Sequence, residues 1–365
     1  MERLAAAGAP DEQRSTFSQR SHGASVRLGY VPALDGLRAL AIAAVVGLHY
    51  WNVPECGGLG VDLFFCLSGF LITSLLLEEH AESGAISLKN FYGRRARRLF
   101  PALALLLVVY LAATEGRGLR TVVLTGFYAG NIVRAFGDDP LLKSPLGHLW
   151  SLAQEEQFYL LWPAALLLLL RLRRNVAPIL LALLFVAVTV WRVLLAHHGA
   201  SSARLQFGPD VRADGMVAGC LLAFLRTRIS IKPTDALTAA AVWTVAIAAF
   251  FSLLLPDWQV YVRPTFNLAA CVLVAAAVSG TGLAEALSIR PLVSLGKISY
   301  SLYLWHLPVL VAVGRDHPWP ALVAAVAVSW LSYRFVEQPF RRRSHRGGNR
   351  FRRVEVAAAS EAHPL

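Results

Sequence analysis

Charged residues are scarce in this chain of 365 residues. Asp, Glu, Lys and Arg make up 16% of the sequence, whereas an ordinary soluble domain carries roughly 25%. Hydrophobic residues make up 56%. A soluble surface needs more charge than this, so the composition argues against a pair of soluble domains and predicts an integral membrane protein.

Cysteine is also rare, and its spacing argues against two further classes of protein. The sequence has four cysteines, none of them in a C-x-x-C pair, so neither a disulfide-rich scaffold nor a zinc ribbon is expected. It has no H-E-x-x-H pattern, and the adjacent His197 and His198 face apart. We therefore expect no metal site.

Basic residues are the one charged type in excess, with a net charge of +12. A strongly basic chain often binds nucleic acid. Here the basic residues lie between long apolar runs, so the expected partner is a lipid bilayer with a basic cytoplasmic edge, and not nucleic acid.

Apolar runs close to the roughly 20 residues that cross a bilayer recur along the chain. We predict an all-α integral membrane protein with about ten transmembrane helices. The predicted spans lie near 33–51, 57–77, 99–115, 148–170, 176–196, 208–225, 236–255, 264–280, 293–313 and 319–338.

Segment 120–136 is apolar but short, and the distribution of basic residues decides how it is interpreted. If it does not cross, 24 Lys and Arg fall on the cytoplasmic side and seven outside. If it crosses, Arg171, Arg173 and Arg174 move outside and the bias weakens. We therefore predict a re-entrant or surface helix at 120–136, with both termini cytoplasmic.

Three regions follow from this topology. Residues 1–30 are polar and lack a signal peptide's apolar core and cleavage site, which predicts a cytoplasmic tail. Residues 31–340 form one transmembrane domain. Residues 341–365 are rich in arginine and are expected to form a disordered tail held near anionic headgroups. The expected location is the plasma (inner) membrane.

Ionisable side chains within spans are the first functional candidates, because each costs several kcal/mol unless it is paired or faces a polar cavity. Asp35 and Arg38 lie three apart near the cytoplasmic end of the first span and are placed to pair. His49 follows Arg38 by eleven residues, roughly 16 Å along a helix and on the same face. Asp62 has no basic partner in its own span.

Ser68 stands beside Gly69 in the second span. Small residues allow close helix packing, and the sequence has no G-x-S-x-G elbow, so packing is favoured over nucleophilic chemistry for Ser68.

Arg95 and Arg98 lie in FYGRRARRLFP. Their charge alone fits either lipid headgroups or a clamp for a diphosphate.

Two later spans carry further polar groups. In HLWSLAQEEQFYLLWP, His148, Ser151 and Glu155 share a helix face. The adjacent Glu156 cannot point the same way, so one carboxylate is expected to pair and the other to face a site. The segment ISYSLYLWHLP carries further polar side chains on most of its faces: Ser301, Tyr303 and His306. It must therefore meet a cavity or other helices.

These segments, together with DGLRALAIAAVVGLH, GVDLFFCLSGFLIT and FVEQPFRR, occur in the order and spacing of the acyltransferase-3 family. The chain resembles this family over nearly the whole of 31–343. The resemblance implies an integral-membrane O-acyltransferase that moves an acyl group, commonly acetyl, from cytoplasmic acyl-CoA to a hydroxyl. Acyl-CoA would be a co-substrate, and no cofactor would be bound permanently.

Acceptors in the family include surface polysaccharides, peptidoglycan, glycolipids and macrolide-type metabolites. A carbohydrate, cell-envelope glycan or glycolipid is the first expectation, and a macrolide-type metabolite the alternative. Some relatives carry a hydrolase-like extracytoplasmic domain after the last span. Only 27 residues follow Gln338, so a stand-alone form is expected.

The resemblance also assigns roles to residues. The family's arginine and histidine pattern falls on Arg38 and His49, and its paired basic motif falls on Arg95 and Arg98. Its histidine–serine–glutamate motif falls on His148, Ser151, Glu155 and Glu156. Within this run, Gln154 replaces a residue that is commonly hydrophobic in the family.

The resulting hypothesis places CoA phosphates on Arg95 and Arg98, with Arg38 at the entrance. His49 acts as general base, oriented by Glu155 or Asp62 as a carboxylate orients histidine in a triad. The alternative mechanism is ping-pong, with the acyl group held on His49 or Ser68.

The alternative of another class is a transporter or flippase, in which the same acids and His49 relay protons. A proton-coupled carrier has little need of four arginines at one helix start, which favours the acyltransferase.

Overall fold

The computed structural model describes residues 27–51, 58–137, 144–173, 175–254 and 258–341, and every regular element in these ranges is helical. Nearly all of the two predicted tails, residues 1–26 and 342–365, lies outside the described residues. The elements are α1 (Pro32–Trp51), α2 (Gly58–Ser83), α3 (Leu88–Ala113), α4 (Leu119–Gly126), α5 (Gly130–Phe136), η2 (Gly147–Leu149), α6 (Trp150–Leu170), α7 (Val176–His197), α8 (Ser202–Phe207), α9 (Asp214–Arg226), α10 (Asp235–Leu254), α11 (Trp258–Ser279), α12 (Gly282–Leu287), α13 (Arg290–Lys297), α14 (Ser299–Val313), α15 (Pro318–Leu331) and η3 (Ser332–Glu337).

Six described helices are long and apolar enough to cross a membrane: α1, α2, α3, α7, residues 260–279 of α11, and residues 318–341 from α15 onward. Shorter apolar helices cover 235–251 and 299–313. The helices thus follow the predicted apolar runs, while six of them meet the length and composition needed for a span.

Three of the apolar runs are interrupted or shortened. Segment 120–136 is divided into α4 and α5 by a turn at Tyr128, whose φ is 54°. Neither piece is long enough to cross alone, in keeping with the predicted re-entrant or surface segment. The run 208–225 contains α9, only 13 residues long, and the run 293–313 is divided into α13 and α14 at Ile298. Hydropathy does not detect such breaks.

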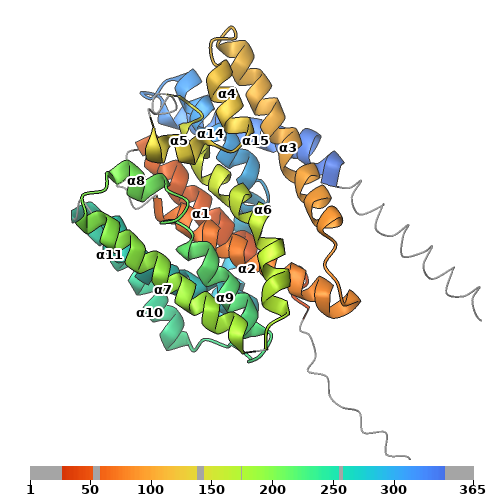
Figure 1. Cartoon of the computed structure of the whole chain (residues 1–365). Helices are drawn as coiled ribbons and strands as arrows, with labels where there is room; N and C mark the ends of the chain where they lie inside the picture. Colours follow the sequence, from red (N-terminus) through yellow and green to blue (C-terminus); the bar gives the residue numbers. More distant parts are fainter. Residues whose placement is uncertain (1–26, 52–57, 138–143, 174, 255–257, 342–365) are drawn as a thin grey trace, which may run out of the picture.

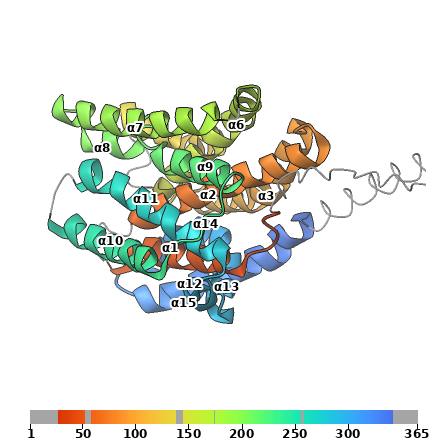
Figure 2. The ribbon, with the colours of Figure 1, turned by 90° about the horizontal axis from the view of Figure 1, so that it is seen from below.

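The helices form a central group surrounded by others (Figure 1). Helix α2 packs against α1 and α9, α11 packs against α10, and α14 packs against α15. Figure 2 shows α6 and α7 along one side of the molecule and α15 along the other, with α1 and α2 between them. The site described below is built from this central group.

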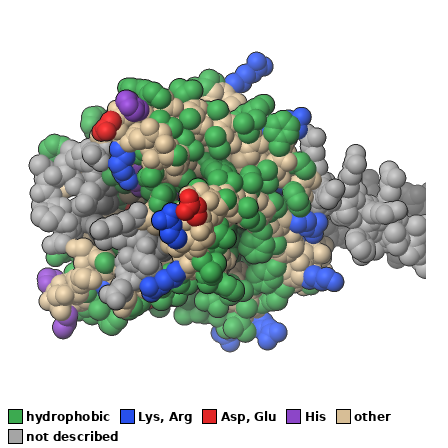
Figure 3. Space-filling model, turned by 90° about the horizontal axis from the view of Figure 1, so that it is seen from above, with side chains coloured by type: hydrophobic (Ala, Val, Ile, Leu, Met, Phe, Trp, Pro, Cys, Tyr) green, Lys and Arg blue, Asp and Glu red, His purple; other side chains and the backbone are tan. Residues whose placement is uncertain are grey.

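The outer helices expose large apolar side chains, which is unfavourable in water but expected in lipid. Leu183 of α7 is 60% exposed and Val323 of α15 is 70% exposed. Seen from above, most of the described surface is hydrophobic and acidic side chains are sparse (Figure 3). The surface therefore agrees with the composition in placing this chain in a bilayer.

Glycines bring the central helices into close contact. A Cβ on Gly69 would overlap the backbone carbonyl of Met216, and one on Gly219 would overlap that of Cys66. Helices α2 and α9 therefore approach backbone to backbone, as small residues permit in membranes. This contact fixes the face of α2 that carries Ser68.

Candidate active site

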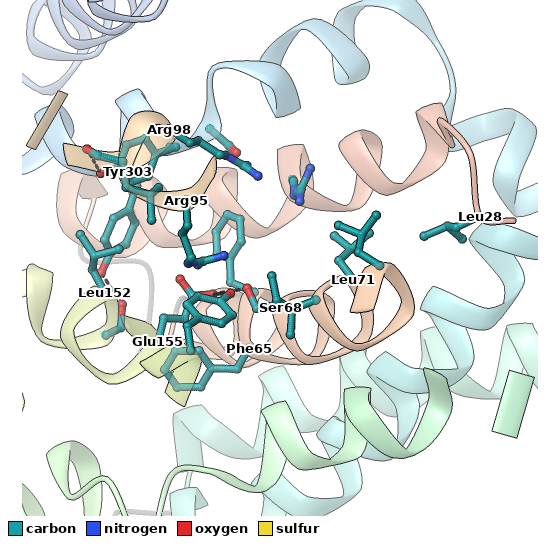
Figure 4. Close-up of a pocket in the computed structure, with 18 of the residues that line it drawn as sticks. Leu28, Phe65, Ser68, Leu71, Arg95, Arg98, Leu152, Glu155 and Tyr303 are labelled. Carbon is teal, nitrogen blue, oxygen red and sulfur yellow. Dashed lines mark hydrogen bonds between the residues drawn. The ribbon is translucent and has the colours of Figure 1, made fainter. Parts of the chain in front are cut away.

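A cavity of about 310 Å³ lies among α1, α2, α3, α6 and α14 (Figure 4). We call it the arginine pocket. Its lining includes three basic and two further polar side chains: Arg38, Arg95, Arg98, Ser68 and Glu155. Leu28 and Gly29, just before α1, also line it. The three arginines predicted to hold CoA thus face one cavity.

The arginines are held by acids and by aromatic rings. Arg95 donates through Nε and Nη2 to Glu156 Oε1, both at 3.1 Å, and its guanidinium lies over the ring of Tyr159. Arg38 pairs with Asp35 at 3.0 Å, as the spacing predicted. Arg98 lies one turn beyond Arg95, on the same face of α3. Glu156 therefore pairs, and Glu155 faces the cavity.

Ser68 donates a hydrogen bond to Glu155, and Tyr159 donates to the same carboxylate at 3.2 Å. The prediction that Ser68 serves packing needs correction, because Gly69 makes the close contact with α9 while Ser68 lines the pocket. A hydroxyl beside a carboxylate is also the arrangement in which a serine can be activated. The ping-pong alternative on Ser68 therefore keeps a structural basis.

A second cavity, of about 350 Å³, lies near the C-terminal end of α1. We call it the histidine pocket. Its described lining includes two imidazoles, two arginines and two aromatic rings: His49, His148, Arg134, Arg315, Trp150 and Phe207.

Three imidazoles meet at this cavity. The ring centroid of His306 lies 5.0 Å from that of His49 and 4.7 Å from that of His148. His306 is fully buried, whereas His49 lines the cavity. The sequence predicted each of these residues separately, and the structure brings them together from α1, η2 and α14.

The hydrogen bonds distinguish the roles of the three rings. His306 Nδ1 faces the carbonyl oxygens of Leu302 and Tyr303 at 3.1 and 2.8 Å, so we assign its proton to Nδ1. His49 Nδ1 lies 2.9 Å from Val45 O and 3.3 Å from His306 Nε2. Both neighbours are acceptors, so the His49 proton also belongs on Nδ1 and Nε2 keeps its lone pair.

His148 differs, because both of its ring nitrogens face backbone carbonyls. Nδ1 lies 3.1 Å from Pro145 O and Nε2 lies 2.8 Å from Tyr303 O. It has no nitrogen turned toward a substrate. Among the three imidazoles, His49 is the one whose geometry suits a general base.

A thin wall separates the two cavities. Tyr303 donates its hydroxyl to the carbonyl of His148, and Ser151 Oγ lies 2.6 Å from the same hydroxyl. Ser151 and Tyr303 line the arginine pocket, while His148 lines the histidine pocket. These hydrogen bonds therefore join the lining of one pocket to the lining of the other.

Neither predicted carboxylate orients His49. Glu155 is bonded to Ser68, and Asp62 is buried in ion pairs with Arg212, at 2.8 Å, and Arg263, at 3.4 Å. The His49 ring instead contacts the Val45 carbonyl and the His306 side chain. This corrects the hypothesis of an acid–histidine pair, because both acids are closer to other donors.

The partners of Asp62 belong to a buried network that the sequence only hinted at. Arg192 pairs with Asp214 at 2.8 Å beside the Asp62 pairs, and each of these side chains is no more than 1% exposed. Arg192 and Arg212 lie inside predicted spans, which was a signal that each needs a partner. The partners come from other helices, so spacing could not identify them.

Ser301 lies outside both pocket linings. It donates to Glu337, and its Oγ lies 3.2 Å from that of Ser332. These contacts join α14 to η3, a π-helical segment. Ser301 therefore holds α14 against η3 and faces neither pocket. Within the described parts of the chain, no cluster of His, Cys, Asp and Glu suits a metal ion.

An all-helical membrane protein with an arginine pocket and a histidine pocket on opposite sides of a thin wall has the layout of a membrane-embedded group-transfer enzyme. A family model described as an acyltransferase domain matches residues 31–334. The chain belongs to this family, the acyltransferase-3 family.

Two curated relatives extend the comparison. The peptidoglycan O-acetyltransferase OatA of Listeria monocytogenes is 34% identical over 350 residues, which cover 86% of this chain and 56% of that protein. The O-acetyltransferase OatA of Staphylococcus aureus is 35% identical over 350 residues, with 86% and 58% covered. The chain thus spans somewhat more than half the length of these relatives. No solved structure matches it significantly.

Proposed function

We propose that this protein transfers an acetyl group from acetyl-CoA to a hydroxyl of a cell-envelope glycan. The observation that carries the proposal is the pair of cavities on either side of the Ser151–Tyr303–His148 wall. One offers guanidinium groups and the other offers an imidazole with a basic nitrogen. The names of both OatA relatives support the acetyl group, and the name of the Listeria monocytogenes relative supports the glycan.

The arginine pocket suits the donor. CoA carries a diphosphate, and planar guanidinium groups bind phosphate oxygens through paired hydrogen bonds. Arg95 and Arg98 take the phosphates, and Arg38 guides the chain at the entrance. Ser151 and Tyr303 stand at the far end of this pocket, so the thioester arm reaches toward the wall.

The histidine pocket suits the acceptor. His49 Nε2 takes the proton of the acceptor hydroxyl as its oxygen attacks the thioester carbonyl. The C–S bond then breaks, an ester forms, and the His49 imidazolium returns the proton to the CoA thiolate. His306 positions the His49 ring through Nδ1, and the hydrogen bond between Ser151 and Tyr303 must open before the thioester can reach the acceptor hydroxyl.

The proposed topology has ten crossings, with both termini cytoplasmic in a plasma membrane. The arginine pocket then opens toward the side from which CoA comes. The histidine pocket opens toward the outer side, where an envelope glycan lies.

Membranes containing the protein test the proposal when they are supplied with labelled acetyl-CoA and a cell-envelope glycan fraction. We expect label to enter the glycan and Arg95→Ala to abolish it. Incorporation that is unchanged by Arg95→Ala would refute the donor site.

The same membranes without acceptor separate the two mechanisms. Direct transfer predicts no stable label on the protein. A stable label on the protein that is lost in Ser68→Ala would instead establish ping-pong transfer.

A further inference from the structure

The arginine pocket continues beyond its arginines to an apolar end. This end is lined by aliphatic side chains from the segment before α1 and from the C-terminal half of α2: Leu28, Leu71, Ile72 and Leu75. Figure 4 shows Leu28 and Leu71 on one side of Arg95. Leu152 and Tyr303 lie on the other side. The cavity therefore runs from an apolar end, past its basic groups, to the end beside the histidine pocket.

The entry segment, residues 27–31, is tied across this apolar end. The Leu28 N–H donates to Glu78 Oε1 at 2.5 Å, which joins the segment to the C-terminal part of α2. Arg27 pairs with Glu82, also of α2, at 2.7 Å. Leu28 is only 8% exposed, and Gly29 has a φ of 60°, which glycine adopts without strain. The Leu28 side chain and the Gly29 backbone therefore both lie at the cavity.

The order of lining groups follows the order of groups in CoA. From its thioester, CoA runs through pantetheine to a diphosphate and then to an adenosine. The proposed function places the thioester near Ser151 and Tyr303 and the diphosphate at the arginines. Along α2, Leu75 lies seven residues beyond Ser68, roughly 10 Å on a helix. The apolar end therefore extends past the polar middle of the cavity, where the adenosine of CoA would follow its diphosphate.

An adenine base suits this apolar end. Its ring is flat and uncharged, so it gains from contact with leucine side chains and does not depend on the balance of charge around the cavity. Its edge carries donors and acceptors that a backbone amide can pair with. Glycine offers only backbone, and in the part of the chain that the structure describes no hydrogen bond uses the N–H or C=O of Gly29.

We infer that the apolar end of the arginine pocket binds the adenine of CoA, with the base against Leu28 and Leu71 and its edge at the Gly29 backbone. This inference rests on the proposed function and names the donor class. A thioester on an acyl carrier protein has the same pantetheine arm but no adenine. The contact therefore favours CoA over a carrier protein as the source of the acyl group.

The first test measures binding to the unmodified protein. Membranes containing it are given radiolabelled CoA, and bound label that is lost in Arg95→Ala counts as specific. ADP and the ribose diphosphate without its base then compete for this site. We expect ADP to displace CoA at about tenfold lower concentration, because the two competitors differ only in adenine. Equal displacement would overturn the inference and leave the proposed function standing, whereas no specific CoA binding would refute both.

Leu71→Ala tests the apolar surface itself. It removes a contact with the base, so we expect ADP to bind about fivefold more weakly and the ribose diphosphate to bind as before. Unchanged binding of the ribose diphosphate shows that the pocket of the variant is folded. Leu77→Ala is the matched control, because Leu77 is a half-buried leucine of the same helix outside the pocket lining. A Leu71→Ala protein with the unmodified preference for ADP would contradict the assignment.

Transfer assays test the choice of donor. Acetyl-CoA and S-acetyl phosphopantetheine share the thioester and the pantetheine arm, but only the first carries a nucleotide. Leu71→Ala should raise KM for acetyl-CoA about fivefold and leave KM for S-acetyl phosphopantetheine unchanged. An equal rise for the two donors would contradict a nucleotide contact at Leu71.

Discussion

At the scale of single residues, the structure assigns different tasks to side chains that the sequence placed together. Glu155 and Glu156 are neighbours, yet one accepts from Ser68 and the other holds Arg95. His49 and His148 line the same cavity, yet only His49 keeps a ring nitrogen for a substrate. Hydrogen-bond partners, and not residue types, therefore separate catalytic candidates from structural ones.

Arg98 offers a test of the donor site at this scale. Arg98→Gln removes a charge from the arginine pocket, and we expect KM for acetyl-CoA to rise about tenfold, because a hydrogen bond to a charged group contributes about 1.5–3 kcal/mol. Arg97→Gln is the control, since Arg97 is exposed and donates to the carbonyl of Gly93 in its own helix. Equal KM values for the two variants, measured in the same membranes, would count against a phosphate site at Arg98.

At the scale of elements, the site depends on how closely α2 approaches its neighbours. Gly69 sets the distance between α2 and α9, and Ser68 beside it then points into the arginine pocket. The sequence favoured packing over chemistry for Ser68. That choice depends on which residue of α2 meets the partner helix, and the sequence does not contain this information.

Substitution of Gly69 tests this contact. Gly69→Ala places a methyl group against the Met216 carbonyl, and we expect the protein to lose about 1–3 kcal/mol of stability. Gly47→Ala in α1 is the control, because nothing lies within 4 Å of its added Cβ, and alanine is favoured over glycine in a helix by up to about 1 kcal/mol. Thermal unfolding in detergent measures both. A Gly69→Ala protein as stable as Gly47→Ala would show that the helices can separate at no cost.

At the scale of the whole molecule, the low charge of the sequence sufficed to predict a helical membrane protein. The family resemblance assigned Arg38, Arg95 and Arg98 to one donor site, and all three line one pocket. The sequence could not predict long-range pairing. Asp62, for example, pairs with Arg212, which lies 150 positions away in the chain. The acid expected beside His49 therefore lies elsewhere. Breaks such as the one at Ile298 also depend on tertiary packing, which hydropathy does not contain.

The proposed topology has its own test. An alkaline phosphatase reporter fused at Gly137 should be active, because this loop is placed outside, and one fused at Arg173 should be silent. Protein levels of the two fusions serve as the control. The reverse pattern would mean that segment 120–136 crosses the membrane and that the cytoplasmic bias of the arginines misled the assignment.

We propose that His49 is the base of the acetyl transfer, and this role is tested by kcat measured with labelled acetyl-CoA and the envelope acceptor. His49→Ala should lower kcat about 100-fold or more, the usual contribution of a general base, while the protein still unfolds at the same temperature. His197→Ala, at an exposed position at the end of α7, should match the unmodified protein. A folded His49→Ala protein that transfers acetyl groups at the unmodified rate would contradict the account.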